Sequence, residues 1–371
     1  MTRVALLAAL CAAPFAPQQQ PPRPVPPAAP AAAPQAVLEA QERAALARHA
    51  AIVAFGQEER FRAELARLCA ELPEDADALP FVPLKEGCLP PRILRNFAQW
   101  HAPVRPGRPV AALDVELEHH PLAAIVDFAE QLRVRGIDLL VVLLPTRIEV
   151  HPEHVVDLDL AGFPGFGSAT QQFVAELAAR GVAAESLLDE FVAGRRADAP
   201  LYLTTDPHLT PRGYELAARV AARRLKELPG HVPGKLVAGR DFTIVQEDFK
   251  YAPEPTIAKR GAQPAVVNGA TLKSGRNYFD WVDPQAPIVV LGDSNARIYS
   301  IGGCDFVAQL GRFTAQRLDF IKADDGSQEA VRKKLALRDA ERWKSMKQVV
   351  WLLSEAVLIP SPRWKRVALP E

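Results

Sequence analysis

Two short segments, far apart in the chain, carry the side chains best suited to nucleophilic catalysis. Gly292-Asp293-Ser294-Asn295 directly follows an apolar run, and Asp206-Pro207-His208 lies earlier in the chain. A serine hydroxyl is a weak nucleophile until a base accepts its proton, and a histidine base needs a third group to fix its tautomer. Ser294, His208 and Asp206 are therefore the candidate nucleophile, base and orienting carboxylate.

The residues around Ser294 suit a turn that exposes a nucleophile. Gly292 permits a tight turn, and the backbone N–H groups that follow it can receive a developing oxyanion. Asp293 is expected to accept hydrogen bonds from backbone amides of this turn, not to act as a base. Asn295 and Arg297 lie just past the nucleophile and are candidates for oxyanion or substrate contacts. A surface or capping role is the alternative for both.

Other polar residues carry weaker hypotheses. Arg332 follows Gly326-Ser327 on a predicted helix, where it either points toward the site or belongs to a solvated helix face. His119 and His120 are adjacent, so their side chains diverge on a helix and do not form a metal site. His151 and His154 are residue types that can bind a metal, but no Cys-x-x-Cys pattern supports a metal site. The sequence predicts neither a metal nor another cofactor.

The elements that must position these residues alternate between helix and strand. Strands are predicted at 138–144, 287–291, 317–321 and 348–353, and helices at 119–135, 168–180, 210–228, 306–313 and 328–344. Repeated βα units with near-continuous apolar strands predict an α/β fold, in which helices cover both faces of a mainly parallel central sheet. Reactive groups in such sheets gather at the carboxyl ends of the strands, so Ser294 and His208 are expected at one rim.

The first 35 residues predict export and belong to no fold. One positive charge at Arg3 precedes ten apolar residues, Val4–Ala13, which is typical of a secretory signal and too short to span a bilayer. We assign 1–16 to a signal peptide and 17–35 to a linker rich in proline and alanine. A buried or disordered start is the alternative. The mature protein is expected in the periplasm or at the cell surface.

Residues 36–109 are predicted to form an N-terminal extension ahead of the main domain at 110–371. Ala36–Glu71 has helical spacing and is expected to pack on that domain, with a coiled-coil stalk as the alternative. The proline-rich stretch 73–109 is expected to loop across the surface. In an oxidising compartment Cys69 and Cys88 are the natural local pair, which leaves Cys304 free and buried. Three cysteines leave this pairing open.

Composition excludes several classes of protein. The 371 residues contain 44 Lys and Arg against 44 Asp and Glu, so the formal net charge is zero. That balance argues against a polybasic nucleic-acid binder, whose affinity depends on neutralising phosphates. No apolar stretch reaches the roughly eighteen residues of a transmembrane helix, which excludes a multi-span membrane protein. Hydrophobic residues make up 49% of the chain, enough for a proper core.

Taken together, the two catalytic segments resemble those of the SGNH hydrolase superfamily. Gly292–Asn295 resembles its nucleophile block and Asp206–Tyr214 its Asp/His block. Ordinary members carry the nucleophile block first and the spacing Asp-x-x-His, whereas here the order is inverted and Thr205 occupies that Asp position. The inverted order is similar to the alginate O-acetyltransferase family, whose SGNH-like domain is circularly permuted. Val141–Glu153 and Val349–Glu355 also resemble this family, and the resemblance covers about residues 110–360.

The resemblance implies an SGNH-hydrolase-like fold of permuted order and an O-acyltransferase, in the first place an O-acetyltransferase. Such an enzyme forms an acyl-Ser294 intermediate and passes the acyl group to a polysaccharide or cell-surface glycan. The implied partners are the polysaccharide acceptor and an acyl donor, with room for a membrane-bound partner that supplies acyl groups; nucleic acid is not among them. The same triad also serves a carbohydrate or small-ester esterase, in which water is the acceptor. A non-catalytic exopolysaccharide-binding or assembly protein is the third hypothesis.

Overall fold

The computed structural model describes the chain in nine long pieces with shorter pieces between them. The long pieces are residues 58–72, 87–100, 119–155, 168–195, 207–251, 263–272, 281–298, 302–323 and 328–370. The predicted signal peptide and linker, together with Asp206, lie outside the described residues. All described residues belong to one compact unit, Ala31–Glu371. None of the helices described there combines the length and apolar character needed to cross a bilayer.

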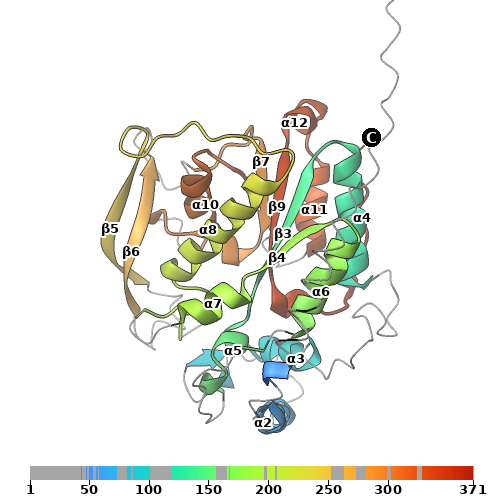
Figure 1. Ribbon diagram of the computed structural model, residues 1–371, viewed down its shortest axis with the longest axis vertical. Helices are drawn as coiled ribbons and strands as arrows, with labels where there is room; N and C mark the ends of the chain where they lie inside the picture. Colours follow the sequence, from blue (N-terminus) through green and yellow to red (C-terminus); the bar gives the residue numbers. More distant parts are fainter. Residues whose placement is uncertain are drawn as a thin grey trace, which may run out of the picture. The chain divides into compact units, whose positions relative to one another are not determined.

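A five-stranded parallel sheet lies at the centre of this unit, with the strand order β4-β3-β9-β7-β8 (Figure 1). The strands are β3 (Asp138–Leu144), β4 (Ala183–Ser186), β7 (Ile288–Gly292), β8 (Asp319–Lys322) and β9 (Gln348–Ser354). In the register of the sheet, Val350 of β9 lies between Leu140 of β3 and Val290 of β7. The predicted parallel α/β sheet is confirmed, so the carboxyl ends of these strands meet at one rim.

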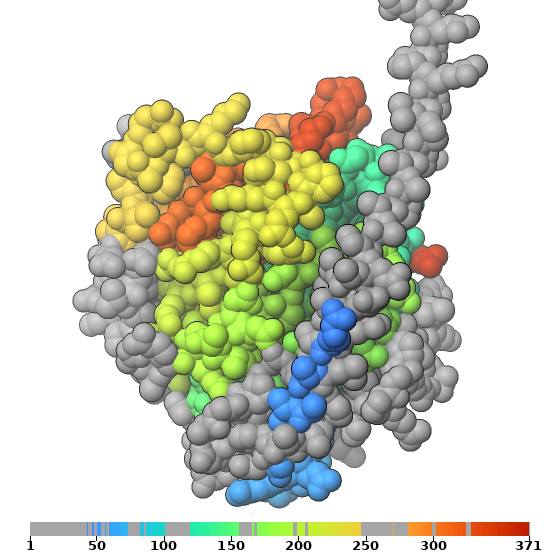
Figure 2. Space-filling view, in the orientation of Figure 1, coloured from blue at the N-terminus to red at the C-terminus, as the bar shows by residue number. Residues whose placement is uncertain are grey.

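Helices cover both faces of the sheet, because successive side chains of each strand enter different cores. Val141, Val349 and Trp351 belong to one core, and Leu140, Val290 and Val350 to the other. The first core is closed by α4 (Pro121–Val134), α6 (Ser168–Ala179) and α11 (Gln328–Ala336). The second is closed by α7 (Leu188–Gly194), α8 (Pro211–Glu227) and α10 (Phe306–Thr314). Figure 2 shows α8 and the chain that follows it covering the near face of the molecule.

The helix ends follow the signals in the sequence. Thr210 caps α8, and its hydroxyl accepts a hydrogen bond from Gly213 N at 3.3 Å, with Pro211 in the first turn. Gly136 follows α4 with a φ of 68°, and Gly181 follows α6 with a φ of 74°. Both glycines adopt the left-handed conformation that ends a helix at little steric cost. These predicted boundaries are confirmed to within about two residues.

One expectation about helices is confirmed in part and two are wrong. The helical stretch predicted over Ala36–Glu71 is helical at residues 43, 47 and 50–52 and in α2 (Glu58–Ala70), but it is interrupted at Gly56, whose φ is 70°. The proline-rich stretch expected to form loops contains the helix α3 (Pro91–Trp100), since proline in a first helical turn forfeits no hydrogen bond. The single helix predicted over 328–344 is two helices, because Asp339 accepts a hydrogen bond from Arg342 N at 2.8 Å and caps α12 (Ala340–Ser345).

The N-terminal extension packs on the main domain, as expected. Asn96 of α3 donates a hydrogen bond to the carbonyl of Ala356 at 2.7 Å, in the short turn η7 (Glu355–Val357) after β9. Trp100 donates to the hydroxyl of Thr170 at 3.1 Å. The ring of Phe61 on α2 stacks on that of Phe166, 4.3 Å away between centroids. The extension therefore shares its core with the domain that carries the sheet.

The local cysteine pair is not formed. No disulfide joins any two of Cys69, Cys88 and Cys304. Cys88 is fully buried in β2 (Cys88–Leu89), which pairs antiparallel with β1 (Val82–Pro83), whereas Cys69 lies half-buried near the end of α2. The expected pairing of Cys69 with Cys88 is therefore wrong for this structure, whereas Cys304 is buried and outside such a pair, as expected.

A second, antiparallel pair of strands stands apart from the central sheet. It is formed by β5 (Phe242–Tyr251) and β6 (Gln263–Leu272), and Figure 1 shows it beyond α8 and α10. Phe242 packs against Trp281 with ring centroids 5.4 Å apart, which anchors the base of this hairpin.

Candidate active site

The candidate nucleophile lies in a turn directly after β7. Ser294 begins the 3-10 turn η5 (Ser294–Ala296), and its side chain is exposed. Asp293 caps the turn: its Oδ1 accepts hydrogen bonds from Asn295 N at 2.8 Å and Asn295 Nδ2 at 2.9 Å. The predicted role of Asp293 as an acceptor for the turn is confirmed. A Cβ at Gly292 would lie 2.9 Å from Cβ of Ala296, which explains why glycine precedes the turn.

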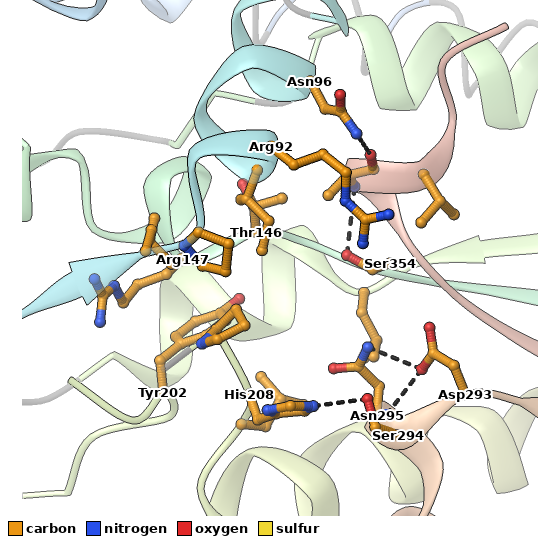
Figure 3. A pocket seen from close by; sticks show the side chains of 18 of the residues that line it. Arg92, Asn96, Thr146, Arg147, Tyr202, His208, Asp293, Ser294, Asn295 and Ser354 are labelled. Atoms are coloured by element: carbon orange, nitrogen blue, oxygen red, sulfur yellow. Dashed lines mark hydrogen bonds between the residues drawn. The ribbon is translucent and has the colours of Figure 1, made fainter. Parts of the chain in front are cut away.

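The candidate base lies on a tight loop that faces this turn. Tyr202 and Leu209 form an isolated antiparallel bridge, and Leu203 N donates to the carbonyl of His208 at 2.9 Å. His208 Nε2 lies 2.9 Å from Ser294 Oγ (Figure 3). The two side chains, expected at one rim of the sheet, therefore lie within hydrogen-bond reach of each other. Asp206, the expected orienting carboxylate, lies outside the described residues.

A buried guanidinium holds the His208 loop in place. Arg147 is 2% exposed and begins the short helix α5 (Arg147–Val150) after β3. Its Nη1 donates to the carbonyls of Leu203 and Thr204 at 2.8 and 3.1 Å, and its Nη2 donates to the carbonyl of Cys88 at 2.9 Å. Cys88 N also donates to the Thr204 carbonyl at 3.0 Å. Arg147 thus joins β3, β2 and the His208 loop, a role that sequence analysis did not assign.

Gly87 is required where β2 approaches this loop. Its φ is 74°, a conformation that other residues rarely adopt, and a Cβ there would overlap the carbonyl oxygen of Thr204. The close approach lets Cys88 pair with the same carbonyl. Any side chain at position 87 would therefore push the His208 loop away from β2.

Ser294 and His208 open into a pocket of about 350 Å³. Its walls come from the carboxyl ends of β3, β7, β8 and β9, from the His208 loop and from α3 (Figure 3). The polar and charged lining residues are Arg92, Asn96, Thr146, Arg147, Tyr202, His208, Asp293, Ser294, Asn295, Lys322 and Ser354. The strand ends supply the rim that the fold predicts. The wall from α3 was missed, because nothing in the sequence of the extension points to the site.

Tyr202 forms a fixed wall of the pocket. Its hydroxyl donates to the carbonyl of Pro145 at 2.9 Å, and the ring is 3% exposed. Burial raises the pKa of the phenol well above its usual value, as do the carboxylates of Glu149 and Glu355. The phenol stays protonated at neutral pH, which suits a structural donor and not a base.

Arg297 does not line the pocket. Its Nε lies 3.0 Å from Oδ2 of Asp305, and the side chains of these two residues are 9% and 1% exposed. Asp305 caps α10 by accepting a hydrogen bond from Ala308 N at 2.6 Å. Burial raises the pKa of Asp305 to about 6, against the opposing effects of Arg297 and the capping amides. The pair therefore ties the nucleophile turn to α10, and a substrate contact by Arg297 is not supported.

Arg332 is also remote from the pocket, and it is not on a solvated face. It is fully buried, donates to the carbonyls of Gln328 and Lys365 at 3.0 and 2.7 Å, and lies 5.5 Å from the ring of Trp351. Burial lowers its pKa to about 10, so it remains charged at neutral pH. Both sequence-based interpretations of Arg332 are wrong, since it joins α11 to the C-terminal segment.

His151, Glu153 and His154 gather behind Tyr202, with candidate ligand atoms within 4.8 Å of one another. Nδ1 of His151 is 2.8 Å from Oε1 of Glu153, and the two imidazoles stack with an angle of 6° between their planes. Parallel stacked rings direct their in-plane lone pairs along separate planes, not toward one point. As placed, the cluster is a hydrogen-bonded pair with a stacked neighbour, and shared ligation would require one ring to turn.

The chain was compared with families and proteins of known sequence. The family model described as an SGNH hydrolase-like domain, acetyltransferase AlgX, matches residues 113–355, more than half of the chain. A probable alginate O-acetylase AlgJ of Pseudomonas fluorescens is 28% identical over 105 residues, which are 28% of this chain and 26% of that protein. Its counterpart in Pseudomonas syringae pv. tomato is 33% identical over 98 residues, 26% of this chain and 24% of that protein. The match thus spans about a quarter of each relative.

Among solved structures, the O-acetyltransferase domain of Pseudomonas putida AlgJ is similar, with a TM-score of 0.47 and 21% identity. The superposition covers 65% of this chain and 84% of that domain.

Replacing Gly87 with alanine should destabilise the protein and displace the His208 loop. We expect a loss of about 1–3 kcal/mol in the free energy of unfolding, from a left-handed φ and a clash with Thr204. Gly136→Ala is the matched control, because its φ of 68° is similar but nothing lies within 4 Å of the added Cβ. Denaturant unfolding of both variants measures the difference, which is the clash alone. Equal losses in the two variants would contradict the close approach.

The buried Asp305 should make stability depend on pH. Its folded pKa of about 6 exceeds the ordinary 3.8, so its contribution is greatest below about pH 4 and is lost as the pH rises to about 6. The unfolding free energy of wild type minus that of Asp305→Asn should fall across this window by an amount on the order of 2–3 kcal/mol, and then stay level.

Asp339→Asn is the matched control, because Asp339 also caps a helix but is exposed. Denaturant titrations from pH 4 to pH 8 measure both variants. A difference for Asp305→Asn that is constant with pH would show that Asp305 is not held with a raised pKa.

Proposed function

The chain belongs to the SGNH hydrolase-like AlgX acetyltransferase-domain family, and we propose that it transfers an acyl group, in the first place acetyl, to a hydroxyl of a polysaccharide. The observation that carries this proposal is the 2.9 Å approach of His208 Nε2 to Ser294 Oγ at the carboxyl rim of the sheet. Family membership supports acyl transfer, and the names of the alginate O-acetylase relatives support a polysaccharide acceptor.

In the first half-reaction, Ser294 Oγ attacks the carbonyl carbon of the acyl donor while His208 Nε2 accepts the hydroxyl proton. Collapse of the tetrahedral intermediate breaks the bond to the leaving group, which takes the proton back from His208. This leaves an acyl-Ser294 ester. Because Nε2 faces the serine, the resting imidazole carries its proton on Nδ1, and Asp206 is the residue proposed to accept that hydrogen bond.

In the second half-reaction, a sugar hydroxyl attacks the acyl carbon. His208 Nε2 accepts the proton of this hydroxyl and returns it to Ser294 Oγ when the acyl-serine bond breaks. The products are the O-acylated sugar and the free serine. The two half-reactions mirror each other, so the same base, His208, serves in both.

Asn295 is the residue proposed to donate to the oxyanion. Its backbone N–H and one N–H of its side-chain amide are both engaged by Asp293. A primary amide has two N–H groups, so the second remains to point toward the pocket that Asn295 lines. Asp293 therefore fixes the amide in position before any charge develops.

The alternative acceptor is water, which would make the protein an esterase. The triad chemistry is the same in both cases, so the two are separated by experiment. Purified protein is incubated with an activated acetyl ester, with and without oligosaccharide acceptors. Acetylated oligosaccharide as the product supports transfer, and acetate alone in the presence of acceptors supports the esterase. Failure of Ser294 to react with a fluorophosphonate would favour the third hypothesis, a non-catalytic exopolysaccharide-binding or assembly protein.

We also propose that the protein is exported, from the charge and apolar run at residues 3–13. The mature N-terminus should lie beyond about Ala13 in protein exported by a host cell, which N-terminal sequencing measures. Exported protein that retains Met1 would contradict the signal peptide.

Substitutions at the triad should abolish turnover without unfolding the protein. Ser294→Ala removes the nucleophile and His208→Ala its base, and Asp206→Asn should cost on the order of 10⁴ in turnover by favouring the wrong imidazole tautomer. The losses should be far from additive in the triple variant, because the three residues act as a unit. Hydrolysis of nitrophenyl acetate measures the turnover of each variant.

Asn295→Ala should lower kcat on the order of 10²-fold, as for other oxyanion donors, measured with the same ester.

Thermal melts are the folding control for this series, since Ser294 is an exposed hydroxyl outside both cores. Near-native turnover by Ser294→Ala would show that Ser294 is not the nucleophile, and the proposed reaction would fall with it.

A further inference from the structure

A second, smaller pocket of about 160 Å³ adjoins the catalytic pocket. Arg92, Asn96 and Val357 line both pockets, so the two share a wall. The remaining lining residues are Gln328, Ile359, Ser361, Arg363 and Trp364. The two pockets thus lie next to each other, with Ser294 in one and Arg363 in the other.

The second pocket has the mixed character that a sugar ring requires. Val357 and Ile359 offer apolar surface for the C–H groups of a ring, above the buried Trp364. Asn96, Gln328 and Ser361 offer amide and hydroxyl groups for its oxygens.

The lining is also positively charged. Arg92 and Arg363 are exposed, and neither forms an ion pair with a residue that the structure describes. The described lining of the second pocket contains no acidic side chain, and that of the catalytic pocket contains Asp293 alone, which holds the nucleophile turn. In Figure 3 the Arg92 side chain extends from α3 over the catalytic pocket. In a chain with no net charge, two unpaired guanidinium groups beside one groove favour a negatively charged ligand.

The walls of this pocket are firmly held. Trp364 is fully buried and donates from its indole nitrogen to the carbonyl of Val357 at 3.0 Å. Arg332 fixes the carbonyl of Lys365, and Asn96 fixes that of Ala356. Because these contacts are made without a ligand, binding would order little besides the two arginine side chains.

We propose that the second pocket binds the neighbour of the sugar unit that receives the acyl group from Ser294. Arg92 and Arg363 bind a carboxylate of this neighbouring unit. This inference rests on the proposed function and adds the acceptor's second subsite. Guanidinium groups bind carboxylates through two parallel hydrogen bonds, which gives orientation as well as affinity. Arg92 and Arg363 lie on either side of residues 113–355, so neither belongs to the part of the chain that matches the family. Specificity for the neighbouring unit is therefore a property of this chain's flanking segments.

Binding to the full chain carrying Ser294→Ala tests the inference, since this variant binds without turnover. Isothermal titration compares an alginate-derived mannuronate tetrasaccharide with its carboxyl-reduced, neutral counterpart. The charged oligosaccharide should bind about tenfold or more tightly than the neutral one. Adding Arg363→Ala or Arg92→Ala should weaken binding of the charged oligosaccharide about tenfold or more, with little effect on the neutral one. Lysine at either position should recover part of the loss, because it keeps the charge but not the fork.

Arg366→Ala is the matched control, because Arg366 is another exposed arginine of the same segment but lines neither pocket. It should leave the affinity unchanged, and thermal melts check the fold of every variant. Equal affinity for the two oligosaccharides, or charged-ligand binding that survives Arg363→Ala, would overturn the subsite. Nitrophenyl acetate hydrolysis by the wild type tests the proposed reaction separately, so a failed subsite and a failed enzyme give different results.

Discussion

The buried guanidinium of Arg147 is the interaction on which the placement of the candidate base depends. The His208 loop follows α7, and among the described residues no strand of the sheet leads into it, so the sheet does not position it directly. Arg147 connects the loop to the sheet, because it lies just after β3 and donates hydrogen bonds to two carbonyls of the loop. A buried charge is costly unless it is hydrogen-bonded, so movement of the loop away from Arg147 would leave that charge poorly satisfied. The hydrogen bonds of Arg147 to the loop thus help to hold His208 2.9 Å from Ser294.

The same interaction makes the N-terminal extension part of the site. The third carbonyl bound by Arg147 is that of Cys88, in the strand that leads into α3. From there α3 places Arg92 and Asn96 in the pocket wall, and Asn96 binds the turn after β9. The family match begins at residue 113, so the segment that completes the pocket lies outside the part shared with the family. Residues inside and outside the part that matches the family therefore line the same pocket.

How much the sequence could predict depends on how far apart in the chain the interacting residues lie. The buried strands and the turn at Ser294 are local patterns, and the strand-end rule placed Ser294 at the rim. The meeting of His208 with Ser294 depends in addition on Arg147, which holds the His208 loop. The helix α3 was missed because its prolines suggest loops until they are placed in a first turn. Arg147, Arg297 and Arg332 show the other limit: each is a charged residue whose partners are distant backbone groups or a buried carboxylate. No spacing in the chain separates such residues from arginines that face a substrate.

Exposure of the proposed nucleophile also bears on how transfer would compete with hydrolysis. Ser294 lies at the surface of the pocket, so water would have access to an acyl group on its hydroxyl. The proposed base is the same for both acceptors, so the proposed triad cannot choose between them. The choice must come from how well a sugar hydroxyl is held at the acyl carbon, since a positioned acceptor reacts at an effective concentration far above that of a free one. In the proposed reaction such contacts come from the pocket walls, and α3 is one wall outside residues 113–355, which match the family. The difference between a transferase and an esterase on this fold would then be a matter of acceptor binding, and it would reside in residues that do not touch the reacting atoms.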